Sequence, residues 1–271
     1  MQESRYGERR QTAQAVSTSR LSALLEAELD QALRDLDGSA SLMVTMARYH
    51  LGLIDAAGAP TQPDVRLAVQ GKRFRPMLAM LTAEAVGGNA QAAAPVAAAI
   101  ELLHNFTLVH DDIQDRSPNR RHRPTVWRIW GDAQAINAGD ALFAAAQLAL
   151  LRTDPGIVPP PTLLTLAREF NRTTISIVRG QVHDLEFEGR SDITPEDYLV
   201  MIAGKTAAIV RYAAWAGAIA GGAPQAVAHR LAEVGEALGL GFQIRDDMLG
   251  IWGNEAATGK APADDIRRRK Q

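Results

Sequence analysis

The 271-residue sequence contains no cysteine. This absence excludes disulfides, iron–sulfur clusters, thiolate zinc sites and thiol nucleophiles, and it fits a reducing compartment. Aromatic residues make up only 5% of the chain, which is low for a sheet protein. No run of alternating β-branched and aromatic residues is flanked by hairpin turn signals. We therefore expect a disulfide-free protein whose fold is not built on a β-sheet.

A strong net charge is also missing, because 29 basic residues stand against 31 acidic ones and the formal net charge is −2. This balance does not indicate a nucleic-acid or anionic-membrane partner. The first residues, MQESRYGERRQTAQ, lack the apolar stretch of a secretory signal. The most apolar stretches, 138–151 and 206–223, contain polar or charged residues and fall short of the roughly 20 uncharged residues of a membrane span. We expect no transmembrane segment and a cytoplasmic location.

Apolar residues make up 46% of the chain and recur at helical spacing between breaks rich in glycine and proline. The expected fold is all-α, a large helical bundle. Helices are predicted over 18–36, 41–53, 75–86, 95–115, 132–151, 161–188, 194–221 and 224–252. We expect residues 1–17 to form a flexible N-terminal arm and residues 18–271 to form a single domain.

Three carboxylates, Asp111, Asp112 and Asp115, end an apolar predicted helix. Asp111 and Asp115 are one turn apart on the same face, where like charges repel. The C-terminal end of a helix is also its unfavourable end for negative charge. The cluster is either a solvated helix end or a site where a divalent cation relieves the repulsion. A set of oxygen ligands suits Mg²⁺ that shares its sphere with substrate phosphates.

Arg120 and Arg121 follow the acidic cluster in a predicted loop. They could simply neutralise it, but guanidinium groups also take the remaining oxygens of a metal-bound phosphate. His104 lies two helical turns before Asp111 on the same face. A lone histidine on an apolar helix is more often a core residue, and it is a candidate ligand only because of these neighbours.

A second apolar helix delivers Asp246 and Asp247, with Gln243 one turn earlier. Two carboxylate-bearing helices suit a bundle in which acidic clusters face each other across a cavity. Lys205 stands in an apolar helical stretch, where its charge is costly unless it meets a phosphate or a carboxylate. Only four of the 29 basic residues are lysines, namely Lys72, Lys205, Lys260 and Lys270.

In this order the motifs resemble those of the trans-isoprenyl diphosphate synthases, also called polyprenyl synthetases. GKRFRP at 71–76 is similar to the family's GKRxRP, DDIQD at 111–115 to its first aspartate-rich motif, and RR at 120–121 to its diphosphate-binding pair. GQVHD, GKT, FQIRDD and the GK of TGKAPADD follow in the family's order. The resemblance covers about 66–271 and implies an isoprenoid-synthase bundle around a central cavity, usually as a homodimer.

The resemblance also implies roles for the matching residues. The catalytic set would be Asp111, Asp112, Asp115, Lys205, Asp246 and Asp247. Of these, Asp111, Asp115 and Asp246 would coordinate Mg²⁺, three ions per active site when substrate is bound. The allylic diphosphate would be held by Arg120, Lys205, Thr206, Gln243 and Lys260, and isopentenyl diphosphate by Lys72, Arg75, His104 and Arg121. Lys270 matches a family lysine that helps to close the site.

The implied reaction condenses isopentenyl diphosphate head to tail with an allylic diphosphate. In the family, the residues five and four positions before the first aspartate-rich motif shape the floor of the product tunnel, and here they are Phe106 and Thr107. Phe106 argues against very long products, whereas Thr107 leaves room. We expect a twenty-carbon product, geranylgeranyl diphosphate, with fifteen and twenty-five carbons as neighbouring outcomes.

The sequence departs from the family at two places. Gly250 replaces the third aspartate of the second aspartate-rich motif, and the sequence given stops at Gln271, where the family continues for several helices. These departures keep open a non-catalytic partner subunit of a prenyltransferase. A class I terpene cyclase is a further alternative, but it would not need the GKRFRP, His104 and Arg121 set.

Overall fold

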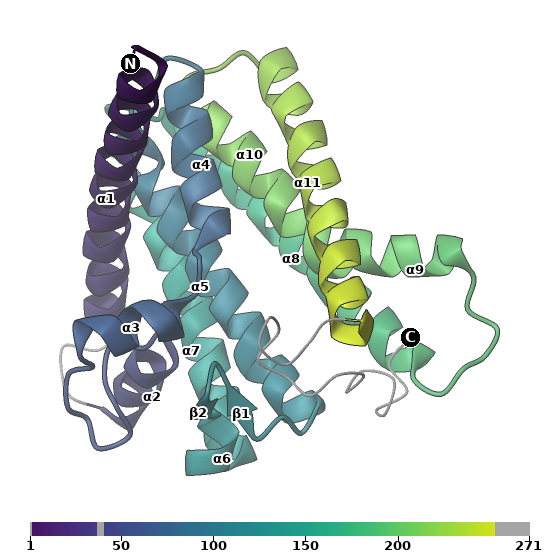
Figure 1. Cartoon of the computed structure of the whole chain (residues 1–271). Helices are drawn as coiled ribbons and strands as arrows, with labels where there is room; N and C mark the ends of the chain where they lie inside the picture. The colour runs from purple at the N-terminus through teal and green to yellow at the C-terminus, as the bar shows by residue number, and fades with distance from the viewer. Residues whose placement is uncertain (1, 37–40, 253–271) are drawn as a thin grey trace.

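A computed structural model describes residues 2–36 and 41–252, with the side chains of 2–17 and of Leu67 left aside. This part of the chain is a bundle of α-helices, as predicted (Figure 1). The elements in chain order are α1 (Gln2–Leu36), α2 (Leu42–His50), α3 (Pro63–Gln70), α4 (Phe74–Ala85), α5 (Ala90–Gln114), β1 (Asn119–Arg120), β2 (Arg123–Pro124), α6 (Val126–Trp130), α7 (Asp132–Leu151), α8 (Pro160–Phe187), α9 (Pro195–Ile202), the π-helical turn η1 (Ala203–Ala207), α10 (Ala208–Ala220) and α11 (Gln225–Trp252).

Helix α5 forms the centre of the bundle, and it packs against α1, α4, α7 and α10. Nearly every residue from Ala90 to Leu103 is buried, because a helix that is apolar on all sides must be surrounded by others. Many of these residues are alanine, whose small side chain lets neighbouring helices approach closely. The long helix that ends in the Asp111–Asp115 cluster is therefore held from several sides.

Capping side chains explain where several helices begin. The side chain of Ser41 accepts a hydrogen bond at the start of α2, and that of Asn89 does so at the start of α5. Thr194 and Asp197 form a reciprocal capping box at the start of α9. These residues satisfy backbone N–H groups that have no partner within the helix.

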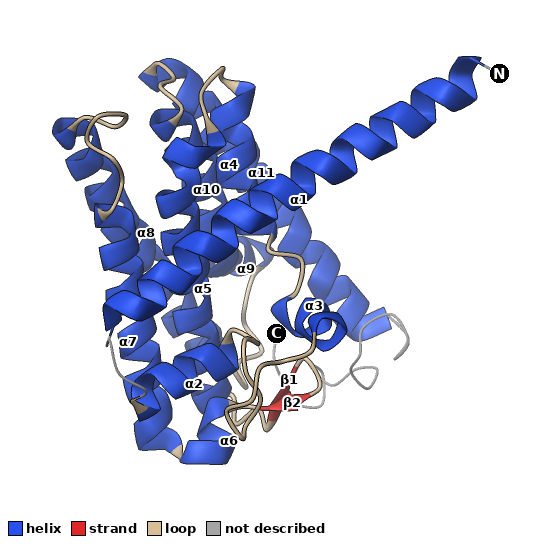
Figure 2. Ribbon diagram, turned by 90° about the vertical axis from the view of Figure 1, so that its left-hand side faces the viewer, coloured by secondary structure: helices blue, strands red, loops and turns tan. Residues whose placement is uncertain are grey.

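The structure departs from the predicted elements in several ways, apart from shifts of three to five residues in the bounds of α2 and α5. Helix α1 begins at Gln2, where a flexible arm is predicted, and Figure 2 shows its start extending away from the bundle. The short helices α3 and α6 and the hairpin β1–β2, with two residues in each strand, are not predicted. Elements of two to eight residues are too short for the hydrophobic period to be read. The predicted helix over 194–221 is interrupted by η1.

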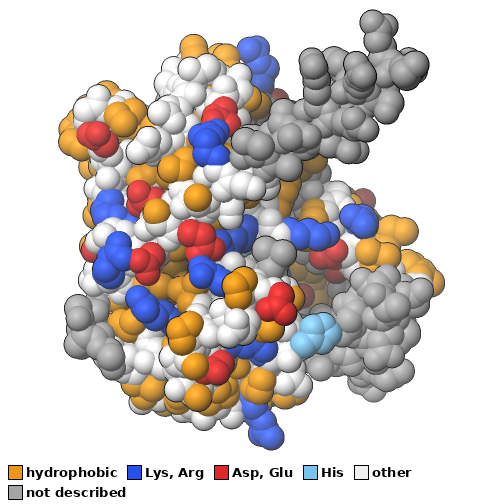
Figure 3. Space-filling model, turned by 60° about the vertical axis from the view of Figure 1, so that its left-hand side comes forward, with side chains coloured by type: hydrophobic (Ala, Val, Ile, Leu, Met, Phe, Trp, Pro, Cys, Tyr) orange, Lys and Arg blue, Asp and Glu red, His pale blue; other side chains and the backbone are white. Residues whose placement is uncertain are grey.

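Charged side chains of both signs are mixed on the surface. Figure 3 shows one face, on which basic and acidic groups lie beside one another without a large patch of one sign. Ion pairs with partly exposed side chains include Arg66 with Glu26 and Arg152 with Glu28. This agrees with the near-neutral net charge.

Among the residues that the structure describes, two helical runs are long and apolar enough to cross a membrane, Ala90–Gln114 and Pro195–Ala220. Of their most apolar windows, 78% and 61% respectively is buried inside the bundle. Core helices pass the same test, so these two runs do not by themselves indicate a membrane span.

Candidate active site

The C-terminal ends of α5 and α11 and the hairpin β1–β2 lie at the same end of the bundle (Figure 1). Helix α8 and the π-helical turn η1 bring further polar side chains to this end. Most of the predicted site residues belong to these five elements. The side chains of these residues form several groups, each held together by its own hydrogen bonds and charge interactions.

Asp112 is turned toward the hairpin and pairs with Arg120. Asp112 is 2% exposed, and both of its carboxylate oxygens accept hydrogen bonds from Arg120 Nε, at 2.9 and 3.1 Å. A second contact joins Arg120 Nη2 to Asp112 Oδ1 at 2.9 Å. Burial raises the pKa of Asp112, and Arg120 counteracts this effect. Asp112 therefore holds the first arginine of the predicted diphosphate pair in place.

Asp111 points from α5 in a different direction and lies close to the half-buried Lys205. Burial raises the pKa of Asp111 to about 6, and the neighbouring carboxyls of Asp115 and Asp184 contribute in the same direction. Lys205 and Arg120 act against this rise. A carboxyl in this environment binds a proton readily, and a cation would stabilise its charged form.

Lys205 meets a carboxylate, as the cost of burying its charge predicts. Its Nζ donates to Asp184 Oδ2 at 2.5 Å. Burial lowers the pKa of Lys205, but the charges of Asp111 and Asp184 outweigh burial, and the pKa is raised. The ammonium is thus held positive between α5 and α8.

A glycine of α8 lets η1 approach closely. A Cβ atom added to Gly180 would lie 2.1 Å from the backbone nitrogen of Lys205. Only a glycine fits at such a crossing. The π-helical geometry at Lys205 is of a kind that is often found at functional sites.

The second aspartate pair divides between two neighbourhoods. The hydroxyl of Thr206 donates to Gln243 Oε1 at 2.7 Å, and Gln243 Nε2 donates to Asp247 Oδ1 at 2.8 Å. Asp247 Oδ2 accepts a hydrogen bond of 2.6 Å from the hydroxyl of Tyr198 on α9. Burial lowers the pKa of the Arg75 guanidinium, whereas the negative charge of Asp246 acts to raise it. The carboxyl of Asp247 is thus tied to α9, whereas Asp246 acts electrostatically on Arg75 of α4.

A second group of cations surrounds His104. Arg75 Nη1 lies 3.4 Å from His104 Nε2. Arg121 donates to the carbonyl of Val69 at 2.7 Å, and a Cβ added to Gly71 would lie 3.1 Å from its guanidinium. Burial, followed by the charges of Arg75 and Arg121, lowers the pKa of His104 well below its ordinary value. Arg75, His104 and Arg121 therefore form one neighbourhood next to the exposed turn that carries Lys72.

His50, at the end of α2, belongs to the same region and is not among the predicted residues. Burial lowers its pKa to about 3, and Arg120 and Arg121 act in the same direction. Its Nε2 is buried and has no hydrogen-bond partner among the described residues. No signal in the sequence points to it, because His50 lies outside every motif and reaches the site only through the fold.

The two residues predicted to form the tunnel floor point in different directions. The ring of Phe106 packs against those of His110 and Phe143, with centroid distances of 4.8 and 5.2 Å. Phe143 lies on α7, so Phe106 fills the space between α5 and α7. The hydroxyl of Thr107 donates to the carbonyl of His104 at 2.8 Å.

Two of the predicted diphosphate ligands, Lys260 and Lys270, lie outside the described residues. Within residues 18–36 and 41–252, no three histidine or carboxylate side chains gather closely enough to form a metal site by themselves. Asp111 nevertheless suits a hard cation, because it is an oxygen donor whose charge is disfavoured by burial and by a neighbouring carboxylate.

Known proteins are similar to this chain in both sequence and fold. The family model described as polyprenyl synthetase matches residues 63–271. A farnesyl diphosphate synthase of Mycobacterium tuberculosis is 43% identical over 229 residues, which are 84% of this chain and 61% of that protein. A geranylgeranyl diphosphate synthase of the same species is 40% identical over 237 residues, 88% of this chain and 65% of that protein.

Solved structures agree with these relatives. The polyprenyl synthetase of Streptomyces coelicolor has a TM-score of 0.82 at 41% identity, and the match covers 93% of this chain and 71% of that one. A polyprenyl synthase from Caulobacter crescentus, complexed with calcium and isoprenyl diphosphate, has a TM-score of 0.74 at 30% identity, over 93% of this chain and 71% of that one. The chain spans about three fifths of the length of the M. tuberculosis relatives. By its motifs, fold and relatives, this chain belongs to the polyprenyl synthetase family.

Proposed function

We propose that the protein is a Mg²⁺-dependent prenyltransferase that joins isopentenyl diphosphate head to tail to an allylic diphosphate. The observation that carries the proposal is the pair of separate cation groups beside the carboxylates of α5. Lys205 lies by Asp111 and Asp184, whereas Arg75 and Arg121 lie by His104. Two groups of this kind suit two diphosphate substrates, whereas a cyclase ionises only one.

The carboxylates of Asp111, Asp115 and Asp246 are the proposed metal ligands. Their support is the oxygen chemistry of the set, the raised pKa of Asp111 and the resemblance to the family. When bound, Mg²⁺ supplies positive charge to the departing diphosphate as a Lewis acid. The solved Caulobacter relative is complexed with both calcium and isoprenyl diphosphate, which supports a divalent cation beside a diphosphate here.

The residues of the chain bind and orient the two substrates. Lys205, with Thr206, Gln243 and Arg120, holds the allylic diphosphate and stabilises the negative charge that develops as its C–O bond breaks. Arg75, Arg121, His104 and Lys72 hold isopentenyl diphosphate. Its double bond then attacks the allylic carbon, and a proton is lost to the released diphosphate. No protein nucleophile takes part, which agrees with the absence of cysteine.

We propose a product of fifteen or twenty carbons, with twenty carbons as the expectation from Phe106 and Thr107 together. The support comes from the two mycobacterial relatives, a farnesyl and a geranylgeranyl diphosphate synthase. The ring of Phe106, backed by Phe143, is the side chain that would stop elongation. Each isoprene unit buries five carbons, about 4 kcal/mol at ~0.8 kcal/mol per carbon, so growth continues until it is blocked.

We also propose that the protein acts as a cytoplasmic homodimer. Helix α8 exposes an apolar stripe at helical spacing, with Ile175, Val178 and Val182 between 47% and 59% exposed. Helix α7 exposes Leu148 and Leu151. Such a stripe on a helix usually marks an interface. Sedimentation equilibrium of the wild type and of Val178→Asp tests this, and a monomeric wild type would contradict it.

The activity is tested by incubating the purified chain with Mg²⁺, labelled isopentenyl diphosphate and, in separate reactions, five-, ten- and fifteen-carbon allylic diphosphates. We expect one metal-dependent prenyl diphosphate, abolished by EDTA and by Asp111→Asn. Asp64→Asn, which changes an exposed carboxyl on α3, is the matched control and should keep activity.

The other outcomes separate the alternatives. A cyclised hydrocarbon would favour a terpene cyclase. No product with any primer would contradict the proposal and favour a non-catalytic partner subunit, a role that agrees with Gly250 in place of the third aspartate. Titration of a catalytic prenyltransferase with the chain would then reveal whether its product changes.

A further inference from the structure

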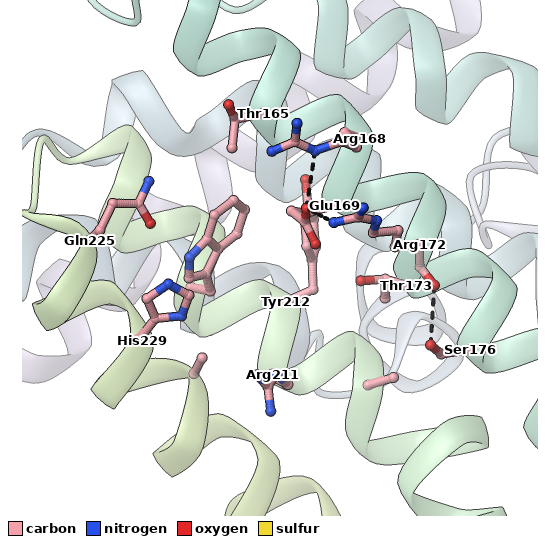
Figure 4. A pocket seen from close by; sticks show the side chains of 13 residues that line it. Thr165, Arg168, Glu169, Arg172, Thr173, Ser176, Arg211, Tyr212, Gln225 and His229 are labelled. Atoms are coloured by element: carbon pink, nitrogen blue, oxygen red, sulfur yellow. Dashed lines mark hydrogen bonds and ion pairs between the residues drawn. The ribbon is translucent and has the colours of Figure 1, made fainter.

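A cavity of about 550 Å³ lies between α8, α10 and α11, and none of the candidate active-site residues lines it. Its volume is within the range of ligand sites, about 300–1,000 Å³. Figure 4 shows Arg168, Glu169 and Arg172 on one side and His229 on the other, with Tyr212 between them. Helices α8 and α11 also carry candidate active-site residues farther along their length.

The α8 wall of this cavity carries an excess of positive charge. Arg168 Nε and Arg172 Nη1 both donate to the same oxygen of Glu169, at 3.3 and 2.8 Å. One carboxylate therefore serves two guanidinium groups, whose side chains are 61% and 66% exposed. The remaining N–H groups can bind an anion. Arg211, from α10, adds a third guanidinium that pairs with Glu236 at 2.5 Å.

Tyr212 and Trp215, two aromatic residues of α10, line the cavity. The polar atom of one has a hydrogen-bond partner and that of the other has none among the residues that the structure describes. The hydroxyl of Tyr212 donates to the carbonyl of Leu166 at 3.0 Å. The indole Nε1 of Trp215 is buried and has no hydrogen-bond partner in the described part of the chain. Trp215 itself is only 7% exposed. The ring of Trp215 thus contributes to the lining of the cavity, whereas its N–H group is turned away from solvent.

We propose that this cavity is a binding site for a phosphorylated small molecule. The phosphate binds the guanidinium groups of Arg168 and Arg172, and the body of the ligand packs against the ring of Trp215. A phosphate suits this wall better than a carboxylate, because it has enough oxygens for the forks of two arginines at once. The body of the ligand then covers the aromatic floor of α10.

The experiment follows the indole N–H signals of the ¹⁵N-labelled chain during titration with adenosine monophosphate, inorganic phosphate, adenosine or citrate. The sequence has four tryptophans, and the signal missing from Trp215→Phe identifies Trp215. We expect this signal to move with adenosine monophosphate, more weakly with inorganic phosphate, and not with adenosine. A signal that moves only with citrate would overturn the preference for phosphate.

Matched arginine variants place the ligand in the cavity. Arg172→Gln should raise the dissociation constant about tenfold or more, which is the usual effect of losing a charged hydrogen bond. Arg179→Gln changes an exposed arginine on the same helix outside the cavity and should leave the dissociation constant unchanged. Lys205→Ala tests binding at the candidate active site and should also have no effect.

Three results would overturn the proposal. One is a Trp215 signal that stays in place at saturating concentrations of all four probes. Another is equal affinity in Arg172→Gln and Arg179→Gln. The third is loss of the shift in Lys205→Ala, which would assign the ligand to the active site. Arg172 is exposed and its removal leaves the core intact. Dissociation constants of Arg172→Gln and Arg179→Gln measured by calorimetry therefore compare the two variants without the signal assignment from Trp215→Phe.

Discussion

Gly180 and Lys205 meet backbone to backbone, since a Cβ on Gly180 would lie 2.1 Å from the backbone nitrogen of Lys205. One turn further along α8 is Asp184, whose carboxylate accepts the hydrogen bond of the lysine. The close helix crossing therefore decides where the ammonium stands.

Gly180→Ala should separate α8 from η1 and displace the ammonium of Lys205. A displacement of about 1 Å at a reacting group can cost about 100-fold in rate, so we expect kcat/KM for the allylic diphosphate to fall by about that factor. Gly241→Ala is the control, because a Cβ there meets nothing within 4 Å. Equal kinetics for the two variants would show that the crossing does not position Lys205.

Removal of the ammonium should affect one substrate more than the other. In Lys205→Gln we expect kcat/KM for the allylic diphosphate to fall about 10- to 100-fold, the cost of a hydrogen bond to a charged group. The KM for isopentenyl diphosphate should change little, because Arg75 and Arg121 belong to the other cation group.

Steady-state kinetics with each substrate varied in turn provide the measurement. Lys72→Gln is the reciprocal variant and should raise the KM for isopentenyl diphosphate instead. If both variants impaired the same substrate, the division into two groups would be wrong.

The partly buried histidine at the end of α2, His50, should make stability depend on pH. The pKa of His50 is about 3 in the folded protein, against 6.5 for an unperturbed histidine. Between these values the unfolded chain binds a proton that the folded chain does not. The free energy of unfolding should therefore fall as pH decreases from about 6.5, by at most about 1.4 kcal/mol per pH unit from this group.

The measurement is urea unfolding between pH 4.5 and 7.5 for the wild type and His50→Gln. The variant should lose less stability toward low pH. Asp111, whose raised pKa has the opposite effect on stability, is present in both proteins and cancels. His229→Gln, at an exposed position, is the control. Parallel curves for the wild type and His50→Gln would refute the burial of a neutral imidazole.

The packing of Phe106 on Phe143 predicts how the product length changes. Phe106→Ala should lengthen the product by at least one isoprene unit, and Phe143→Ala should do so less, because it only supports the first ring. The double variant should differ from the sum of the single ones, since the residues are in contact. Chromatography of the dephosphorylated products gives the lengths. An unchanged distribution in Phe106→Ala would mean that another side chain forms the floor.

The long helices could be predicted from the sequence, and α7 and the end of α11 lie where the apolar spacing places them. The π-helical turn at Lys205 could not, because it depends on the glycine of another helix. The same holds for the site. A lysine in an apolar helical stretch had to meet an anionic group, but only the helix crossing selects Asp184. His50 lies in no motif, and its low pKa depends on burial by the fold and on distant arginines.

The pairing of Arg120 with Asp112 has a consequence for substrate capture. Both carboxylate oxygens hold the guanidinium before any diphosphate arrives, so an otherwise flexible side chain has lost its rotational freedom during folding. Binding of a diphosphate therefore does not have to include the entropy cost of ordering the Arg120 side chain. The carboxylate of Asp112 also offsets part of the positive charge of Arg120. An incoming diphosphate therefore binds to a rigid hydrogen-bond donor whose net charge is reduced. The reduced charge favours release of the product, and the rigidity favours binding.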